Sequence, residues 1–361
     1  MTGPRAAAVA IFQAAGGAGF LRAAGDGWTL ERGPTGSRLR RRKAPPFLIL
    51  IYHRVHPEPT PFMIDAIPPE RFDRQMRHLA EAYHPLALDE LIERSRTGTV
   101  PKGAVAVTFD DGYADNEAHA LPILRKHGVP ATVFLVTGCI DTGRVPWHDE
   151  VLLAFAGARG GSVAAVGGAE GTILPLHTEA DRHRAAFATL AALKPLPERD
   201  RLAAVAAVRA ALDAESGHGD GAIMLDWKGV RRMRSHGIQF GAHTVTHPIL
   251  SRVTPERARE EIAESKRAIE EKLGEEVTLF AYPNGRPEDF TDTNVSQVQT
   301  AGFRAALTTS FGANETGDDP FRWRRGTPWE TDPARFALKV AYYRLQSAAS
   351  SSRSARAGER A

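Results

Sequence analysis

Apolar runs of strand length alternate with amphipathic stretches along the first half of the chain. The runs are residues 47–52, 104–109 and 131–136, and nearly every side chain in them is apolar. Apolar positions spaced three and four apart predict helices over residues 69–82, 88–96 and 119–127. This strand–helix–strand order predicts parallel pairing in an α/β fold, as a sheet or a barrel.

The pattern changes at about residues 150–225, where glycine and alanine dominate. Two alanine-rich helices over 178–193 and 198–214, separated by prolines, predict a helical insertion there. Strand-like runs then return, at residues 239–242, 277–282 and 305–308.

A helix predicted over residues 255–273 follows the insertion and is the most clearly signalled element of the chain. Thr254 can cap it, Pro255 suits its first turn and Gly274 ends it. An apolar stripe marks its buried face, formed by Ala258, Ile262, Ile269 and Leu273.

Charge separates the ends of the chain from its body. The net charge is +3, yet residues 1–45 hold eight basic and two acidic side chains. We predict a basic, flexible arm over 1–44, one folded domain over 45–340 that contains the insertion, and a disordered tail over 341–361. The arginine cluster at 38–43 has no aromatic residue within it. It therefore indicates a solvated linker or an anionic-surface contact, and no nucleic-acid partner is expected.

Composition narrows the class of protein. Of the 361 residues, 42% are hydrophobic and 25% are charged, as in ordinary globular domains. No run approaches the ~18 apolar residues of a membrane span, so none is expected. The single cysteine, Cys139, excludes an internal disulfide and a cysteine-rich zinc site. The first residues form no clear signal peptide, which favours the cytoplasm, with the cell envelope as the alternative.

Two adjacent carboxylates, Asp110 and Asp111, directly follow the strand predicted over 104–109. In α/β folds, functional groups gather at the carboxyl ends of the strands. One of the two could bind a cation while the other stays free to take a proton. The alternative is an acidic turn in which Asp111 caps and Gly112 supplies an unusual backbone angle.

Histidines follow two other predicted strands in the same way. His243 and His247 are four residues apart, so both imidazoles can reach one metal ion if the segment forms a helical turn. A polar helix face is the alternative. With a carboxylate, the two make a set that leaves positions open for water and substrate. His53 follows the strand at 47–52, where the sheet would also present Asp110 and His243.

Together these segments resemble the polysaccharide deacetylases with a NodB-type domain, the family-four carbohydrate esterases, over residues 47–329. TFDDGYADN is similar to the first motif of that family, HTVTH to its second and FAYPNG to its third. LIYHRV and GVPATVFLVTGCID resemble a subgroup that processes exopolysaccharides or related glycans. The resemblance implies a distorted (β/α) barrel of about seven strands, here with a helical insertion.

The resemblance also implies a reaction and a set of roles. Members of the family hydrolyse N-acetyl groups on amino sugars, using water activated by a divalent ion, with zinc as the expected metal. By position, Asp110 would be the general base, and Asp111, His243 and His247 would hold the ion. His148 is then not needed as a ligand, because the set is complete.

This chain departs from the family pattern at two places. In the third motif, many members carry an arginine where Ala281 stands and a tyrosine where Asn284 stands. Many also carry a late histidine where this chain has threonines after Leu307. In the subgroup that the chain resembles, the first-strand histidine takes the role of the late one. We therefore assign the general acid to His53.

Contacts with the substrate are expected at three further places. The turn Tyr282-Pro283-Asn284 would offer an N–H to the oxyanion, and because Pro283 has none, a neighbour such as Asn284 would donate. Trp147 could line a sugar cleft or pack the insertion. Arg325 could contact sugars, hold the Asp110 carboxylate, or belong to a charged strand edge.

The leading hypothesis is a metal-dependent N-deacetylase whose partner is an N-acetylated glycan, either a polysaccharide, an oligosaccharide or a glycolipid. An amidase on a small non-sugar compound and a catalytically silent glycan-binding module are the alternatives. A broad cleft with tryptophans would favour the sugar, and a closed pocket the amidase. The retained carboxylate pair and metal ligands count against the silent module, because binding alone requires neither.

Overall fold

Parallel strands form the centre of the molecule. The computed structural model describes residues 28–33, 36–41, 44–166, 172–213 and 222–345. Within these residues, seven strands pair in the order β12-β11-β10-β9-β6-β5-β3. Their bounds are β3 (Leu48–Tyr52), β5 (Ala104–Phe109), β6 (Ala131–Leu135), β9 (Gln239–Ala242), β10 (Leu279–Ala281), β11 (Ala305–Phe311) and β12 (Trp323–Arg325).

The first and last strands of this order also meet, which closes the sheet into a barrel. Gly326, just after β12, donates its N–H to the Ile49 carbonyl (2.7 Å) and accepts from the Ile51 N–H (3.0 Å). Only glycine fits here without a shift, because a Cβ would lie 2.8 Å from the Tyr343 ring. The predicted (β/α) barrel is confirmed: within the described residues, seven strands form its closed path, and the two-residue β4 (His84–Pro85) pairs with β5 outside that path.

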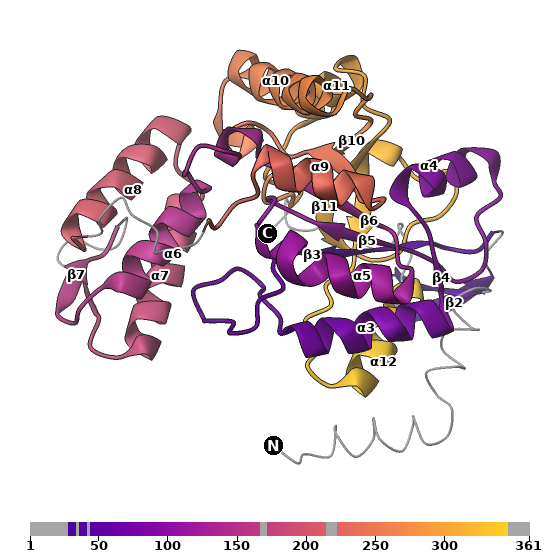
Figure 1. Cartoon of the computed structure of the whole chain (residues 1–361), viewed down its shortest axis with the longest axis horizontal. Helices are drawn as coiled ribbons and strands as arrows, with labels where there is room; N and C mark the ends of the chain where they lie inside the picture. Colours follow the sequence, from indigo (N-terminus) through magenta and orange to yellow (C-terminus); the bar gives the residue numbers. More distant parts are fainter. Residues whose placement is uncertain (1–27, 34–35, 42–43, 167–171, 214–221, 346–361) are drawn as a thin grey trace.

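Helices cover the outside of the barrel (Figure 1). They are α3 (Pro69–Ala82), α4 (Leu88–Thr97), α5 (Leu121–His127), α9 (Trp227–Ser235), α10 (Pro255–Leu273), α11 (Asp292–Thr300) and α12 (Pro333–Leu345). Short elements lie in the connections: β4 (His84–Pro85), η1 (Asn116–Ala120), η2 (Thr137–Cys139), η3 (Leu250–Arg252) and η4 (Pro320–Arg322). Helices α3 and α10 have the predicted bounds, whereas α9, α11 and α12 were not predicted. None of the described helices is long and apolar enough to cross a membrane.

Alternation along the strands separates two apolar cores. On β5, Val105 and Val107 pack with residues of the outer helices, whereas Ala104 and Ala106 belong to the core inside the barrel. The alternation continues past the end of the strand, so every second residue still faces the inside of the barrel. It therefore points Asp110 into the mouth of the barrel.

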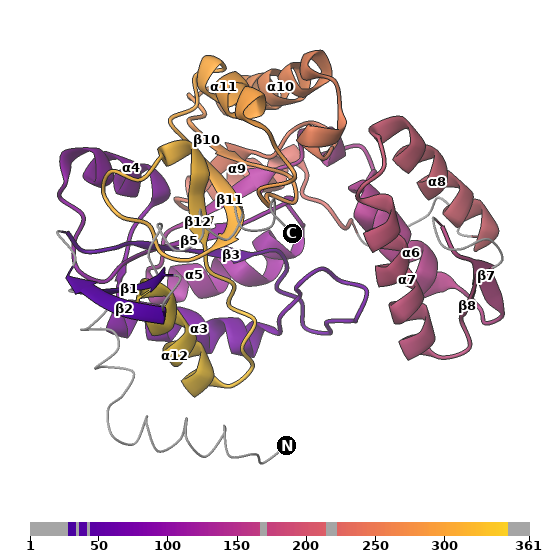
Figure 2. The ribbon, with the colours of Figure 1, turned by 180° about the vertical axis from the view of Figure 1, so that it is seen from behind.

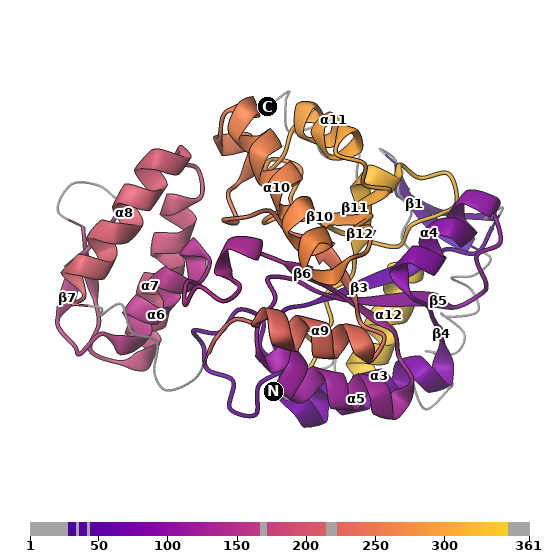
Figure 3. The same ribbon diagram turned by 45° about the horizontal axis from the view of Figure 1, so that its top comes forward.

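The insertion lies between β6 and β9 and stands to one side of the barrel (Figure 3). It consists of α6 (Trp147–Gly157), the hairpin β7 (Ser162–Ala164) and β8 (Ile173–Pro175), α7 (Glu179–Leu193) and α8 (Glu198–Ala211). Its core also contains Phe62 and Ile249, from the loops after β3 and β9. The predicted insertion is thus docked at the end of the barrel where the strands finish.

The ends of the described chain carry more regular structure than the sequence predicted. Within the predicted flexible arm, β1 (Trp28–Gly33) and β2 (Gly36–Arg41) form an antiparallel hairpin beside α12 (Figure 2). Helix α12 runs to Leu345, so the predicted start of the tail at residue 341 falls inside a helix. Residues 1–27 and 346–361 lie outside the described part of the chain.

Candidate active site

Asp110 and Asp111 lie directly after β5 and point to different partners, as the sequence predicted. Asp110 continues the inward alternation of the strand. Asp111 instead has a left-handed backbone (φ 72°), and so has Gly112 (φ 83°). A Cβ on Gly112 would lie 2.7 Å from the Leu135 side chain, so this turn requires glycine.

Arg325, the last residue of β12, holds the Asp110 carboxylate from the other side of β3, which lies between β12 and β5 in the closed barrel. Two guanidinium nitrogens donate to the two carboxylate oxygens, each at 2.7 Å, and Nε donates to the Thr308 carbonyl at 2.8 Å. Both side chains are buried. Burial alone would raise the pKa of Asp110, but the charge and hydrogen bonds of Arg325 lower it to about 2. Of the roles considered for Arg325, the structure shows contact with Asp110.

Replacing Arg325 with glutamine should destabilise the fold by about 3–5 kcal/mol at pH 7, because Asp110 would be left as a buried, unpaired charge. Without the guanidinium, burial raises the pKa of Asp110. The wild type loses pair stabilisation as the pH falls from about 4 toward 2. The variant is relieved at higher pH, as the pH falls from the raised pKa of its Asp110 toward about 4, because its carboxyl takes up a proton there. The difference in unfolding free energy between the wild type and Arg325→Gln should therefore become smaller as the pH is lowered.

Urea unfolding of both proteins at pH 7 and near pH 4 checks this expectation. Arg322→Gln is the matched control, because Arg322 makes its ion pairs at the surface, where such pairs contribute about 0–1 kcal/mol. If the difference in unfolding free energy between the wild type and Arg325→Gln stayed constant with pH, an unpaired Asp110 carboxylate would not be the cause of the destabilisation.

His243 and His247 are brought together, but not by the helical turn that the sequence suggested. The segment after β9 is an irregular bend in which Thr244 (φ 68°) and His247 (φ 58°) have left-handed backbones. His243 Nδ1 lies 2.7 Å from the Ala281 carbonyl, so Nδ1 carries the proton. Its Nε2 is therefore free to act as a ligand.

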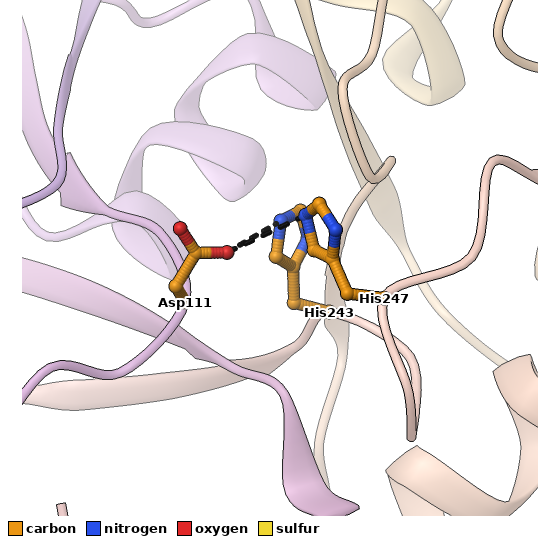
Figure 4. A group of neighbouring side chains, drawn as sticks. All are labelled: Asp111, His243 and His247. Carbon is orange, nitrogen blue, oxygen red and sulfur yellow. Dashed lines mark ion pairs between the residues drawn. The ribbon is translucent and has the colours of Figure 1, made fainter. Parts of the chain in front are cut away.

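The two imidazoles face Asp111 and form a potential metal-ligand group with it (Figure 4). Asp111 Oδ1 lies 3.6 Å from His243 Nε2 and 3.4 Å from His247 Nε2. Ligand atoms held about 2.1 Å from a tetrahedral ion would be roughly 3.4 Å apart. Asp111 Oδ1 is buried and has no hydrogen-bond partner in the described chain. An ion among the three would satisfy it, so these residues fit a metal.

Electrostatics favour the same interpretation. Burial lowers the pKa of His243 to about 4 and lowers that of His247 well below its usual value. Both imidazoles are therefore neutral at pH 7, which is the form that binds a metal. Burial, with Asp110 and Asp149 nearby, raises the pKa of Asp111. A cation would favour the ionised carboxylate and offset that cost.

His53 lies at the edge of this group, in the loop after β3. Its side chain is 17% exposed, and Nδ1 lies 3.4 Å from the Asp65 carboxylate. A positive charge on His53 would lower the pKa values of Asp110, His243 and His247, which assigns His53 to the same mouth of the barrel. The structure thus brings the five residues singled out in the sequence to one place.

Sequence reasoning missed the contribution of α6. Its first turn places His148 Nε2 3.8 Å from Asp111 and packs the His148 ring against His247, with ring centres 4.8 Å apart. Asp149 accepts a hydrogen bond from the Tyr113 hydroxyl at 2.7 Å. His148 had been set aside as a ligand, and it is not part of the three-residue group, but it borders that group. The available signal was a Trp-His-Asp run soon after a predicted strand.

The remaining predicted contacts differ in their surroundings. Trp147 is 4% exposed and lies in the core of the insertion beneath Arg201, so the packing interpretation describes it. The Tyr282 N–H donates to the Leu307 carbonyl, and Pro283 has no N–H. Asn284 is thus the member of this turn that can still donate from its backbone, and its φ of 58° turns the chain there.

A family model supports the relationship that the motifs suggested. The model described as "Polysaccharide deacetylase" matches residues 97–306. The chain belongs to the polysaccharide deacetylase family. The family resemblance is therefore confirmed. Its members are hydrolases of carbon–nitrogen bonds other than peptide bonds, and they depend on a metal.

Individual relatives are distant. YxkH of Bacillus subtilis (strain 168) is 21% identical over 281 residues, which cover 77% of this chain and 70% of that protein. The poly-beta-1,6-N-acetyl-D-glucosamine N-deacetylase of Staphylococcus epidermidis is 38% identical over 69 residues, or 19% of this chain and 23% of that one. The structure of IcaB from Ammonifex degensii aligns with a TM-score of 0.53 at 21% identity, covering 83% of this chain and 97% of IcaB. This structural likeness shows the shared fold.

Proposed function

We propose that this polysaccharide deacetylase removes N-acetyl groups from amino-sugar residues of a glycan, with zinc as its metal. The observation that carries the proposal is the Asp111–His243–His247 group beside the Arg325-held carboxylate of Asp110. A two-histidine, one-carboxylate set is typical of a zinc site that keeps a position open for catalysis. When bound, such an ion polarises the acetamide carbonyl and makes water easier to deprotonate.

We assign the role of general base to Asp110. Arg325 keeps it ionised at neutral pH and occupies one acceptor direction on each oxygen. An ionised carboxylate has about four acceptor directions, so others remain for the proton of the attacking water. We assign the oxyanion contact to the Asn284 N–H.

We assign the role of general acid to His53. When the carbon–nitrogen bond breaks, the amine must gain a proton to leave, and the products are acetate and a free amine. His53 is partly exposed and held near Asp65 on the β3 side of the mouth. Positioned proton transfer of this kind contributes about 100- to 10,000-fold to a rate.

The glycan class rests on the relatives. The Staphylococcus epidermidis protein is named for poly-beta-1,6-N-acetyl-D-glucosamine, and its short aligned stretch is the more similar of the two sequence relatives. We therefore infer a polymer of N-acetylated amino sugars, of the kind that exopolysaccharide-processing relatives modify, as the substrate class.

Acetate release from N-acetylglucosamine oligomers tests the function directly. We expect release that rises with oligomer length, because a polymer enzyme binds neighbouring sugars. Release from small non-sugar acetamides alone would support the amidase alternative. A chain that bound zinc and oligomer but released no acetate would support the silent binding module.

His53→Gln should slow acetate release from an N-acetylated oligomer by about 100- to 10,000-fold, because the leaving amine needs a proton. The loss should be much smaller with an aryl acetate ester, whose phenolate leaves without one. His56→Gln is the control, because His56 is in the same loop and its imidazole contacts the Glu58 backbone and the His119 ring. Equal losses on amide and ester would contradict the acid role.

A further inference from the structure

The bend that carries the two histidines is held from outside by a buried carboxylate. The backbone N–H groups of Val245 and Thr246 donate to one oxygen of Glu261 at 2.7 and 2.8 Å. The Thr246 hydroxyl donates to its other oxygen at 2.6 Å. Glu261 lies on α10 and is 0% exposed.

A fully buried carboxylate is costly unless hydrogen bonds and a counter-charge compensate it. Arg257, one helical turn earlier, provides the charge, with Nη2 2.5 Å from Glu261. The same guanidinium lies 3.8 Å from Glu198 of α8, so the ionic contacts reach the insertion. Within the described residues, the partners of the Glu261 carboxylate thus belong either to the bend or to its own helix.

The bend needs such support because its backbone is strained. Left-handed conformations at non-glycine residues such as Thr244 and His247 cost of order 1–3 kcal/mol each. The carbonyls of Thr244 and Val245 accept from the N–H groups of Thr137 and Gly138 at 3.1 and 2.8 Å. Glu261 binds the N–H groups on the other side, so the bend is clamped on both.

We propose that Glu261 is a positioning residue of the metal site. By holding the N–H groups of residues 245 and 246, it fixes the bend that turns His247 Nε2 toward Asp111. It is not one of the three residues of the metal group and acts through the backbone of the bend. This inference rests on the proposed metal site.

The sequence contained a sign of this role. Glu261 is on the buried face of the helix predicted over 255–273, between Ala258 and Ile262 of its apolar stripe. A charged side chain on that face has to find partners inside the protein. Here those partners are the bend and Arg257.

The test compares zinc affinity with stability in the full-length chain. The variants are Glu261→Ala, Glu261→Gln and the matched control Glu270→Ala. Glu270 is also on α10, also pairs with a basic residue (Lys266, 2.8 Å), and also accepts from a backbone N–H (Val277, 3.0 Å), but it has no contact with the bend. Zinc dissociation constants come from competition with a chromogenic chelator, and stability comes from urea unfolding of the metal-free proteins.

We expect Glu261→Ala to weaken zinc binding by about 10- to 100-fold. Glu261→Gln should bind with intermediate affinity, because its amide oxygen can still accept from the two N–H groups. Glu270→Ala should bind zinc as the wild type does, even if it is less stable. If Glu261→Ala does not fold, the zinc affinities of Glu261→Gln and Glu270→Gln are compared instead, and weaker binding by Glu261→Gln alone supports the positioning role.

The possible failures can be told apart. Wild-type affinity in the Glu261 variants would overturn the positioning role and leave the proposed function intact. Equal weakening in the Glu261 and Glu270 variants would assign the effect to general destabilisation. A wild-type chain that bound no zinc would refute the proposed metal site and, with it, this inference.

Discussion

With asparagine in place of Asp110, acetate release should fall by about 100- to 10,000-fold while zinc affinity stays close to that of the wild type. The amide of asparagine keeps the size of the carboxylate but cannot take a proton from water. The three side chains of the metal group are all kept, because its carboxylate is the neighbouring Asp111. The measurement is acetate release at saturating zinc, together with a zinc titration of the same preparation.

Stability has to be separated from catalysis in this experiment. Asp110→Asn leaves Arg325 buried without its counter-charge, which costs about 3–5 kcal/mol. The double variant Asp110→Asn, Arg325→Met removes both charges and should recover much of that loss. If the double variant also recovered activity, Asp110 would not be the base.

Asp111→Asn provides the contrast. It should lose zinc affinity as well as activity, because it removes a ligand. Substitution of Asp110 would thus lower acetate release alone, whereas substitution of Asp111 would lower both acetate release and zinc affinity. Zinc affinity that fell equally in both variants would contradict the division of roles between them.

Elements whose ends are determined locally could be predicted closely from the sequence. Strand β5 was predicted with the observed bounds because its six residues form a nearly all-apolar run between Gly103 and Asp110. Helix α10 was predicted equally well because Thr254 caps it and Gly274, with φ 69°, ends it. In both cases the deciding interactions lie within a few residues of the element.

Elements that form only through tertiary packing could not be predicted from the sequence. Helix α6 is buried on most of its surface, so it has no polar face to reveal a helical period. Strand β12 has three residues and is recognisable only by its pairing with β11. The first turn of α6 therefore adds His148 and Asp149 to the site, although no helical periodicity in the sequence predicts this helix.

The candidate site shows the same division. The identity of the chemical groups, Asp110, Asp111, His243 and His247, could be read from the residues and their positions after strands. The backbone conformation that brings His243 and His247 together could not be predicted from the sequence. Their bend depends on backbone contacts with residues 137–138 and on Glu261, which are distant in the sequence.

Loss of the metal should abolish acetate release and also lower the stability of the wild type. A ligand bound at 100 times its dissociation constant stabilises the fold by about 2.7 kcal/mol, so a chelator should lower the melting temperature. His247→Ala should weaken zinc binding by at least about 100-fold, because it removes one of three protein ligands. The variant should then melt at the same temperature with and without chelator.

His127→Ala is the matched control for this last experiment. His127 is also a partly buried histidine beside a carboxylate, with Nε2 2.9 Å from Asp73, but it lies on α5 outside the metal group. It should keep both zinc-dependent acetate release and the chelator-induced drop in melting temperature. A His247→Ala protein that still lost stability on chelation would show that the ion binds elsewhere, because the bend would no longer supply its ligand.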